Sequence, residues 1–306
     1  IKDYGCVVIF FIICVIASIA IPRFLSFNNF MMIIKQASIP IIVCVAMTMV
    51  LMTGGIDLSL GYMIGLASIA CGIFIKSMGM PIAAGLLLTL LIGAAFGLLN
   101  GICIQLLHVP AFIATLGTGY IIYGIAQIIS NGETVNHLPD ALLALGKTKI
   151  GPLTTTVLVS AAVCVVFYYI LHKSTFGRNL TAFGMNEAAS RLSGVNTPFI
   201  NMAVYVISGV LSGAVGILLT IDVNCAQPTM GGGNYTFQVI TGTVIGGANL
   251  YGGKGTIVGA VFGMLTLKVI ANCINLANAP YYFVDAIMGV IILIAIILEN
   301  VKNKKL

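Results

Sequence analysis

Residues 31–52 read MMIIKQASIPIIVCVAMTMVLM, and residues 53–61 continue with TGGIDLSLG. The first stretch carries a single charged side chain, Lys35, among residues that are almost all apolar. A helix of about 20 mainly apolar residues spans the hydrocarbon core of a bilayer. The glycines that follow are typical of a helix end, because glycine adopts backbone conformations that other residues avoid. The stretch therefore predicts a membrane-spanning helix that ends at Met52.

Nine further apolar runs bring the predicted number of spanning helices to ten. They cover residues 4–21, 58–75, 81–107, 111–129, 150–171, 199–221, 235–248, 256–276 and 281–298. Hydrophobic residues make up 59% of the chain and charged residues only 7%, whereas soluble domains carry about 25% charged residues. A surface of this composition has to face lipid. The predicted fold is an all-α polytopic membrane protein that forms one transmembrane domain over residues 1–306.

The lysines and arginines indicate which side of the membrane each loop occupies, since cytoplasmic loops carry an excess of them. The basic segments are the loop after the sixth predicted helix and the C-terminal tail, with Lys173, Arg178, Arg191, Lys302, Lys304 and Lys305. Even numbers of helices precede both segments, which places them and the N-terminus on the cytoplasmic side of a bacterial inner membrane. Because basic residues are scattered singly, the net charge of +6 does not indicate nucleic-acid binding.

The sequence contains no convincing constellation for catalysis or nucleotide binding. Gly253-Lys254-Gly255 lacks the Ser or Thr that follows the lysine of a phosphate-binding loop, and Ala248 replaces the first glycine of that motif. The histidines His108, His137 and His172 fit neither a metalloprotease nor a hydrolase motif. The eight cysteines have no C-x-x-C spacing, so we expect them to fill helix contacts. The sequence therefore predicts neither an enzyme nor a metal site.

Glycines recur at four-residue spacing in several predicted helices, for example at Gly93, Gly97 and Gly101. Such faces let helix backbones approach closely in lipid, where apolar burial gives no drive for association. Residues 54–61 (GGIDLSLG) also resemble residues 246–253 (GGANLYGG). The structural glycines of this pattern are Gly54, Gly55, Gly61, Gly246 and Gly247. Either the echo reflects general helix packing, or it marks two pseudo-symmetric halves of inverted topology.

Two charged residues fall within the last two predicted helices, Lys268 and Asp285. Charged side chains inside a bilayer are costly and require a partner or water. Counted from the turn between these helices, both residues lie one to two turns deep, so an ion pair is geometrically possible. The alternative is that Lys268 extends to the interface or faces a water-filled cavity.

The loop at residues 173–197 contains a short helix of its own. Asn186 is suited to cap the N-terminus, Glu187 complements the positive end of the helix dipole, and Gly194 is suited to the left-handed position after the last turn. A capped helix outside the membrane provides a surface on which another protein can bear. The alternative is an ordinary connection between spanning helices.

Three blocks of sequence together resemble one known family. They are residues 53–61 (TGGIDLSLG), 109–117 (VPAFIATLG) and 184–196 (GMNEAASRLSGVN), with shorter matches at residues 208–209, 226–228, 246–247 and 252–255. In this order they resemble the ribose-type sugar permeases of ATP-binding-cassette (ABC) importers, in the branched-chain amino acid and sugar permease superfamily. The resemblance extends from about residue 30 to the C-terminus.

The resemblance implies a transport subunit that moves a ribose-like monosaccharide and binds no cofactor itself. The implied partners are a second permease copy, a periplasmic or lipoprotein sugar-binding protein, and an ATPase subunit with two nucleotide-binding domains that binds ATP and Mg. The loop at residues 173–197 would carry the coupling helix that the ATPase moves. The implied coupling residues are Asn186, Glu187, Ala188, Ala189, Arg191, Leu192, Ser193 and Gly194.

The substrate and its pathway are less closely defined. Residues 234–238 read NYTFQ where these permeases usually carry acidic residues, which leaves room for a substrate other than ribose, such as an autoinducer-like furanosyl ligand. Small or polar side chains near mid-depth are the expected pathway residues: Thr48, Thr115, Thr118, Thr241 and Thr243. The competing classes are a secondary transporter coupled through Lys268 and Asp285, and an intramembrane enzyme.

Overall fold

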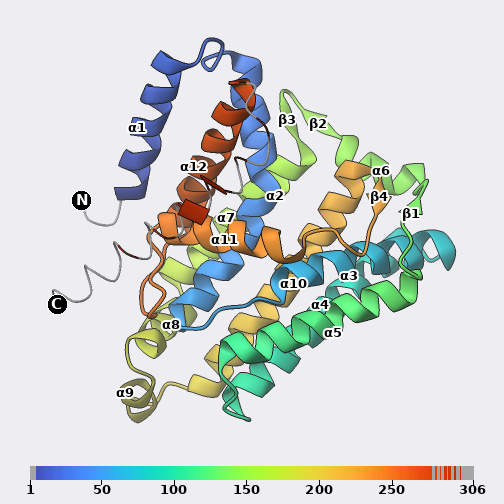
Figure 1. Ribbon diagram of the computed structural model, residues 1–306. Helices are drawn as coiled ribbons and strands as arrows, with labels where there is room; N and C mark the ends of the chain where they lie inside the picture. Colours follow the sequence, from blue (N-terminus) through green and yellow to red (C-terminus); the bar gives the residue numbers. More distant parts are fainter. Residues whose placement is uncertain are drawn as a thin grey trace.

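The computed structural model of the chain describes residues 5–277, together with Pro280, Phe283, Ala286, Ile287, Gly289, Val290, Leu293 and Ile297. Helices form most of this part of the chain (Figure 1). The longer helices are α1 (Gly5–Ala20), α2 (Phe27–Met52), α3 (Leu60–Gly72), α4 (Ile82–Gln105), α5 (Ala111–Ser130), α7 (Thr155–Lys173), α10 (Thr197–Val223), α11 (Gly232–Ile245) and α12 (Ile257–Leu276). The shorter ones are α6 (Asp140–Lys147), α8 (Thr175–Met185), α9 (Glu187–Leu192) and the π-helical turn η2 (Ile73–Ser77), which extends α3.

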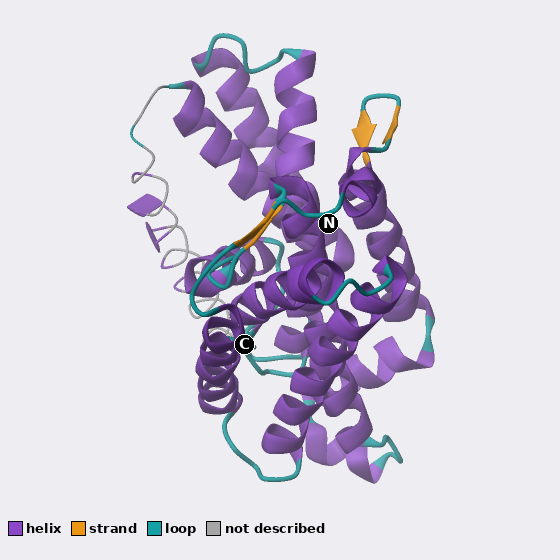
Figure 2. Cartoon of the chain, turned by 90° about the vertical axis from the view of Figure 1, so that its right-hand side faces the viewer, coloured by secondary structure: helices purple, strands orange, loops and turns teal. Residues whose placement is uncertain are grey.

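Four two-residue strands complete the described part of the chain and form two antiparallel pairs (Figure 2). β2 (Lys149–Ile150) and β3 (Leu153–Thr154) make a hairpin before α7. β1 (Val135–Asn136) pairs with β4 (Cys225–Ala226). Since β4 follows the C-terminus of α10 and α9 precedes its N-terminus, the β1–β4 pair and α9 lie at opposite ends of α10.

The predicted membrane fold is confirmed. The helices of the structure begin and end within a few residues of the predicted bounds. Seven described helices are long and apolar enough to cross a membrane, and α1 is a shorter apolar helix. The sixth predicted helix begins at Thr155 rather than at residue 150, because residues 149–154 form the β2–β3 hairpin. The eighth is α11, whose 14 residues are fewer than a full span needs. The tenth, at residues 281–298, lies mostly outside the described residues.

Backbone contacts at glycine hold the largest helix pair together. α4 and α10 pack against each other along much of their length. A Cβ atom added to Gly209 would lie 2.0 Å from the carbonyl oxygen of Gly93, and one added to Gly93 would lie 2.3 Å from the carbonyl oxygen of Gly209. Gly97 makes a similar approach to Tyr205. Gly93, Gly97 and Gly209 therefore lie at helix contacts in which no larger side chain fits.

α3 and α11 both begin inside the bundle rather than at its surface. Gly61, in the first turn of α3, donates its backbone N–H to Thr236 Oγ1 at 3.0 Å, and a Cβ atom on Gly61 would lie 2.1 Å from the Gly232 carbonyl oxygen. The neighbouring Tyr62 ring lies beside Tyr120, which is in the middle of α5. The two helix starts therefore meet at the depth where α5 is halfway through its length.

A buried carboxylate anchors the connection between α2 and α3. Asp57 is 2% exposed, and its carboxylate accepts hydrogen bonds from Ser208 Oγ at 2.6 Å and from the backbone N–H of Ser59 at 3.0 Å. Asn100 Nδ2 donates to Ser59 Oγ at 2.9 Å. A buried charge at this depth requires such partners. The network attaches the connection at residues 53–59 to α4 and α10, and the sequence analysis did not single out Asp57.

Gly209→Ala tests the close contact between α4 and α10. The new methyl group meets the Gly93 carbonyl, so the helices must separate, and we expect a loss of about 1–3 kcal/mol in unfolding free energy. The control is Gly213→Ala, one turn along the same helix, where the nearest atom would be 3.6 Å away. Alanine is the better helix former, so this control should be neutral or stabilising. Thermal unfolding in detergent, followed by circular dichroism, measures both variants; equal midpoints would contradict the packing argument.

Candidate functional site

The loop at residues 173–197 folds into two short helices: α8 lies beside the end of α2, and α9 lies at the periphery of the bundle, near the start of α10 (Figure 1). Ser174 caps the N-terminus of α8, because its hydroxyl accepts from the Gly177 N–H, and α8 buries Leu180 and Phe183 against the bundle. Near its end, a Cβ atom on Gly184 would lie 1.8 Å from the Met52 carbonyl oxygen. α8 is therefore docked tightly on the end of α2.

α9 has the capped form that the sequence predicts. Asn186 Oδ1 accepts a hydrogen bond from the Ala189 N–H at 2.9 Å, and Ser193 Oγ donates to the Ala189 carbonyl. Gly194 has a φ of +85°, the left-handed conformation that favours glycine after a helix. Of the predicted coupling residues, only Glu187 is half-buried, and the other seven are exposed. Leu192 is 91% exposed, so an apolar side chain stands at the tip of this helix.

A chain of polar side chains connects α9 to the bundle. Glu187 Oε1 accepts hydrogen bonds from Arg191 at 3.1 Å and from Gln105 Nε2, at the end of α4, at 3.2 Å. Gln105 Oε1 in turn accepts from Asn201 Nδ2, in the first turns of α10, at 2.7 Å. Arg191 Nε also donates to Thr197 Oγ1 at 3.2 Å. The Glu187–Gln105–Asn201 tie, as we name these three residues, joins α9 to both α4 and α10.

The sequence analysis missed Gln105 and Asn201. Both are buried polar residues within or at the end of apolar helices, and such residues mark specific partners in a membrane protein. This signal was present in the sequence, but it does not identify the partner, because Gln105 and Asn201 are 96 residues apart.

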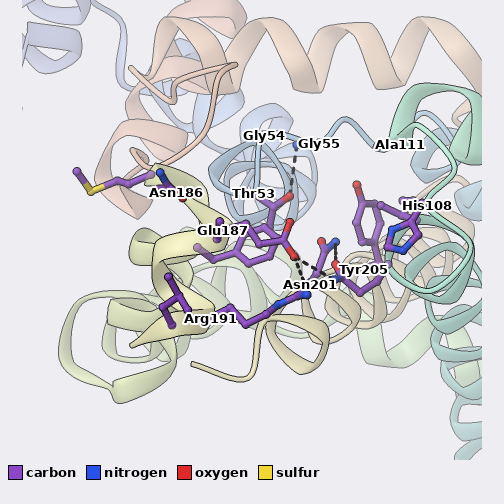
Figure 3. Close-up of a pocket in the computed structure, with 17 residues that line it drawn as sticks. Thr53, Gly54, Gly55, His108, Ala111, Asn186, Glu187, Arg191, Asn201 and Tyr205 are labelled. Atoms are coloured by element: carbon purple, nitrogen blue, oxygen red, sulfur yellow. Dashed lines mark hydrogen bonds and ion pairs between the residues drawn. The ribbon is translucent and has the colours of Figure 1, made fainter. Parts of the chain in front are cut away.

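A cavity of about 890 Å³ lies between α9 and the bundle (Figure 3). Its walls come from four parts of the chain: residues 53–55 after α2, the connection between α4 and α5, residues 183–192 of α8 and α9, and the first turns of α10. The tie crosses one side of this space. The size of this cavity therefore depends on how far α9 lies from α10 and from the end of α2.

Each structural glycine of the two echoing segments has either a positive φ or a contact that is too close for a larger side chain. Gly54 and Gly247 have positive φ values of +78° and +88°. A Cβ atom on Gly55 would lie 2.3 Å from the Tyr205 hydroxyl, and one on Gly246 would lie 2.3 Å from the Gly259 carbonyl oxygen. The two echoing segments also meet, since a Cβ atom added to Gly252 would lie 3.2 Å from the backbone nitrogen of Gly54. Whether they relate two symmetric halves stays a prediction.

The five threonines predicted to line the pathway are all buried within the chain. Each hydroxyl donates to the carbonyl one turn earlier in its own helix, and these threonines are Thr48, Thr115, Thr118, Thr241 and Thr243. In this conformation they serve helix packing, and a role in the pathway stays a prediction. The predicted partner of Lys268, Asp285, lies outside the described residues; Lys268 Nζ donates to Gln238 Oε1 at 3.5 Å.

Comparison with known proteins identifies relatives over almost the whole chain. A family described as the permease component of branched-chain amino acid transport systems matches residues 29–296. The ribose import permease protein RbsC of Escherichia coli (strain K12) is 36% identical over 300 residues, 95% of this chain and 92% of that protein. RbsC of Haemophilus influenzae is 33% identical over 298 residues, 96% and 92% of the two chains. The L-arabinose transport system permease protein AraH of Escherichia coli (strain K12) is 34% identical over 305 residues, 99% and 92%. No solved structure matches the chain.

Asn186→Ala tests the cap of α9. The variant loses the bond to the Ala189 N–H, which costs about 1 kcal/mol in a typical helix and corresponds to about fivefold faster amide exchange. Hydrogen–deuterium exchange with mass spectrometry should show this acceleration at residues 188–191. The control is Asn179→Ala, which changes the same residue type within α8, where it caps no helix. Equal exchange of α9 in the two variants would show that the cap does not stabilise this helix.

Proposed function

We propose that the chain, which belongs to the family of branched-chain amino acid transport system permease components, moves a small sugar across the bacterial inner membrane, as its relatives named for sugar import do. It is a multi-pass membrane protein that acts as the permease subunit of an ABC importer. The relatives above are named for ribose and arabinose import. We therefore assign a monosaccharide, with a pentose as the first choice, as the cargo.

The single observation that carries the coupling part of this proposal is the way in which α9 is held. It is a capped helix outside the long apolar helices, with Leu192 at its tip and a polar tie to two of those helices at its base. Such a helix can seat in a groove of another protein and transmit that protein's movement to α4 and α10. The partner in our proposal is an ATPase subunit with two nucleotide-binding domains, which binds ATP and Mg.

The remaining partners follow from the importer class. A sugar-binding protein delivers the cargo at the outer face, and a second permease copy completes the pathway between the two chains. Alternation between outward-open and inward-open states then moves the sugar. In this arrangement α9 and both termini face the cytoplasm, and the β1–β4 pair faces outward.

The orientation is tested by cysteine labelling. Leu192→Cys puts a thiol on α9, and Glu133→Cys puts one in an exposed turn after α5, at the opposite end of the bundle. None of the eight native cysteines is exposed, so background labelling should be low. A membrane-impermeant maleimide should label the Glu133→Cys variant in cells with a permeabilised outer membrane, and the Leu192→Cys variant only in inside-out vesicles. Labelling of Leu192→Cys from outside would reverse the orientation and remove α9 from the reach of an ATPase.

Coupling through α9 is tested by replacing Glu187 and Arg191 together with leucine. The double variant breaks the ion pair and the bond to Gln105, so movement of the ATPase should no longer reach α4. We expect ribose uptake by the reconstituted importer to fall about tenfold, as for loss of an interface hot spot. ATP turnover should persist but lose its stimulation by the binding protein.

The control for this variant is Glu133→Leu, which removes an exposed charge at the far end of the bundle and should leave uptake unchanged. Normal uptake by the double variant, in a complex that assembles at the wild-type level, would refute the coupling role of α9.

A further inference from the structure

Charged residues of the long helices converge on one cavity. In the described part of the chain, the nine longer helices contain four residues of the types Asp, Glu, Lys and Arg: Lys35 in α2, Lys173 at the end of α7, Asp222 in α10 and Lys268 in α12. Three of the four, Lys35, Asp222 and Lys268, line a cavity of about 350 Å³. Charged side chains within a membrane face a partner or a water-filled cavity, and they mark the paths of polar substrates. Their convergence from three helices therefore indicates a polar site.

The cavity lies in the half of the bundle that is opposite to α9. Its wall on α2 comes from residues 32–40, in the first half of that helix, and Asp222 is the second-last residue of α10. Val239, in the middle of α11, lies beside Cys44, whose Sγ donates to the Val239 carbonyl at 3.7 Å. α11 therefore begins only at the middle of α2, and this leaves room for a cavity beside residues 32–40. In the orientation of the proposed function, this is the outer half of the membrane.

The polar side chains of the lining can both donate and accept hydrogen bonds. Lys35 Nζ and the Asp222 carboxylate form an ion pair at 2.9 Å, and both side chains are partly exposed. Gln36 is exposed beside them and carries both a donor and an acceptor. Lys268 Nζ has three donors, of which one reaches Gln238 Oε1 at 3.5 Å in the described part of the chain. A ligand with several hydroxyl groups can satisfy groups of both kinds.

A proline adds a backbone acceptor to the wall. Pro40 lies inside α2 and has no N–H, so the Gln36 carbonyl lacks the donor that a regular helix would supply. Gln36 and Pro40 are one turn apart on the same face, and both line the cavity. A carbonyl freed in this way is satisfied in a membrane protein by a neighbouring group or by water. A sugar hydroxyl can take the place of that water.

The Asp222 carboxylate favours a sugar over the headgroup of an anionic lipid. A phosphate in the cavity would lie near this carboxylate and be repelled by it, whereas a hydroxyl donates to it. Apolar side chains complete the lining and offer a surface for the carbon face of a sugar ring: Met32, Ile39, Pro40 and Leu219. The volume of about 350 Å³ lies at the lower end of the range of small-molecule sites, about 300–1,000 Å³.

We propose that this cavity binds the imported sugar in the outer half of the membrane, after the binding protein releases it. Gln36, Asp222 and Lys268 are the residues that contact its hydroxyl groups. The proposal rests on the proposed function, which supplies both the sugar and the orientation of the chain. It places a first stop for the sugar within each permease chain, ahead of the pathway between the two copies.

Protection of a cysteine by sugar tests the site. Leu219→Cys puts a thiol in the apolar part of the lining and leaves the proposed polar contacts in place. The permease and its ATPase are placed in phosphatidylcholine nanodiscs without nucleotide or binding protein, and the thiol is labelled with a small thiosulfonate. A site on a transport path has to release its cargo, so we expect a dissociation constant on the order of 10 mM and use sugar at about 100 mM. D-ribose or L-arabinose, whichever the importer takes up, should slow labelling about tenfold, in proportion to the unoccupied fraction.

Two controls accompany this measurement. Glu133→Cys puts a thiol in an exposed turn at the same end of the bundle but outside the cavity, and the sugar should not change its labelling rate. Glycine betaine at the same concentration should not slow labelling of the Leu219→Cys variant, because it has no hydroxyl group.

Asp222→Asn, combined with Leu219→Cys, tests the assigned contact. The amide keeps the size of the side chain but loses its charge, so half-protection should require about tenfold more sugar. The matched control is Asp140→Asn, which changes an exposed acid on α6 outside the cavity and should leave protection unchanged. If Asp222→Asn does not assemble, Gln36→Leu leaves the Lys35–Asp222 ion pair in place and should weaken protection instead.

The outcomes separate this proposal from the function on which it depends. If the reconstituted importer takes up no neutral sugar, the proposed function fails. If uptake proceeds but the transported sugar does not protect the Leu219→Cys variant, the site is refuted. Protection that is unchanged in both the Asp222→Asn and the Gln36→Leu variants refutes it equally. Labelling that ignores sugar but slows when phosphatidylglycerol is added to the nanodiscs would overturn the proposal and assign the cavity to a lipid headgroup.

Discussion

The contact between the backbones of Gly93 and Gly209 sets the geometry on which the rest of the bundle depends. In lipid, apolar side chains gain nothing by leaving their surroundings, so helices associate through close packing and polar contacts. The approach at these glycines fixes the distance between α4 and α10. It thereby brings Gln105, at the end of α4, within hydrogen-bond distance of Asn201, in the first turns of α10. The attachment point of α9 is thus a consequence of helix packing deep in the bundle.

α9 has only six residues, and an isolated helix of that length is not stable in water. It persists because Asn186 caps it, α8 seats it on the end of α2, and Glu187 ties it to α4 and α10. These are directional contacts rather than a broad apolar interface. A force on α9 is therefore passed to particular helices, while its exposed face remains available to a partner.

The local features of this fold could be predicted from sequence, whereas contacts between distant residues could not. Composition and apolar runs located the spanning helices, and the cap of α9 was evident from Asn186, Glu187 and Gly194. By contrast, Asp57 and Ser208 lie 151 residues apart, and no spacing rule connects them. The pathway threonines illustrate a different limit: a hydroxyl in an apolar helix can face a polar passage or bond to its own backbone, and only the structure shows that Thr48 and Thr243 do the latter. The length of α11 depends on where it enters the bundle beside Gly61, which its own residues do not reveal.

α10 has 27 residues, and at about 1.5 Å per residue it forms a rod roughly 40 Å long. One end carries Asn201 and the tie to α9, and the other continues into the β1–β4 ribbon. A rigid rod cannot tilt at one end without displacing the other. In the proposed importer, a binding protein at the outer end of α10 and an ATPase at α9 act on the two ends of one rigid helix, so movement at either end displaces the other directly.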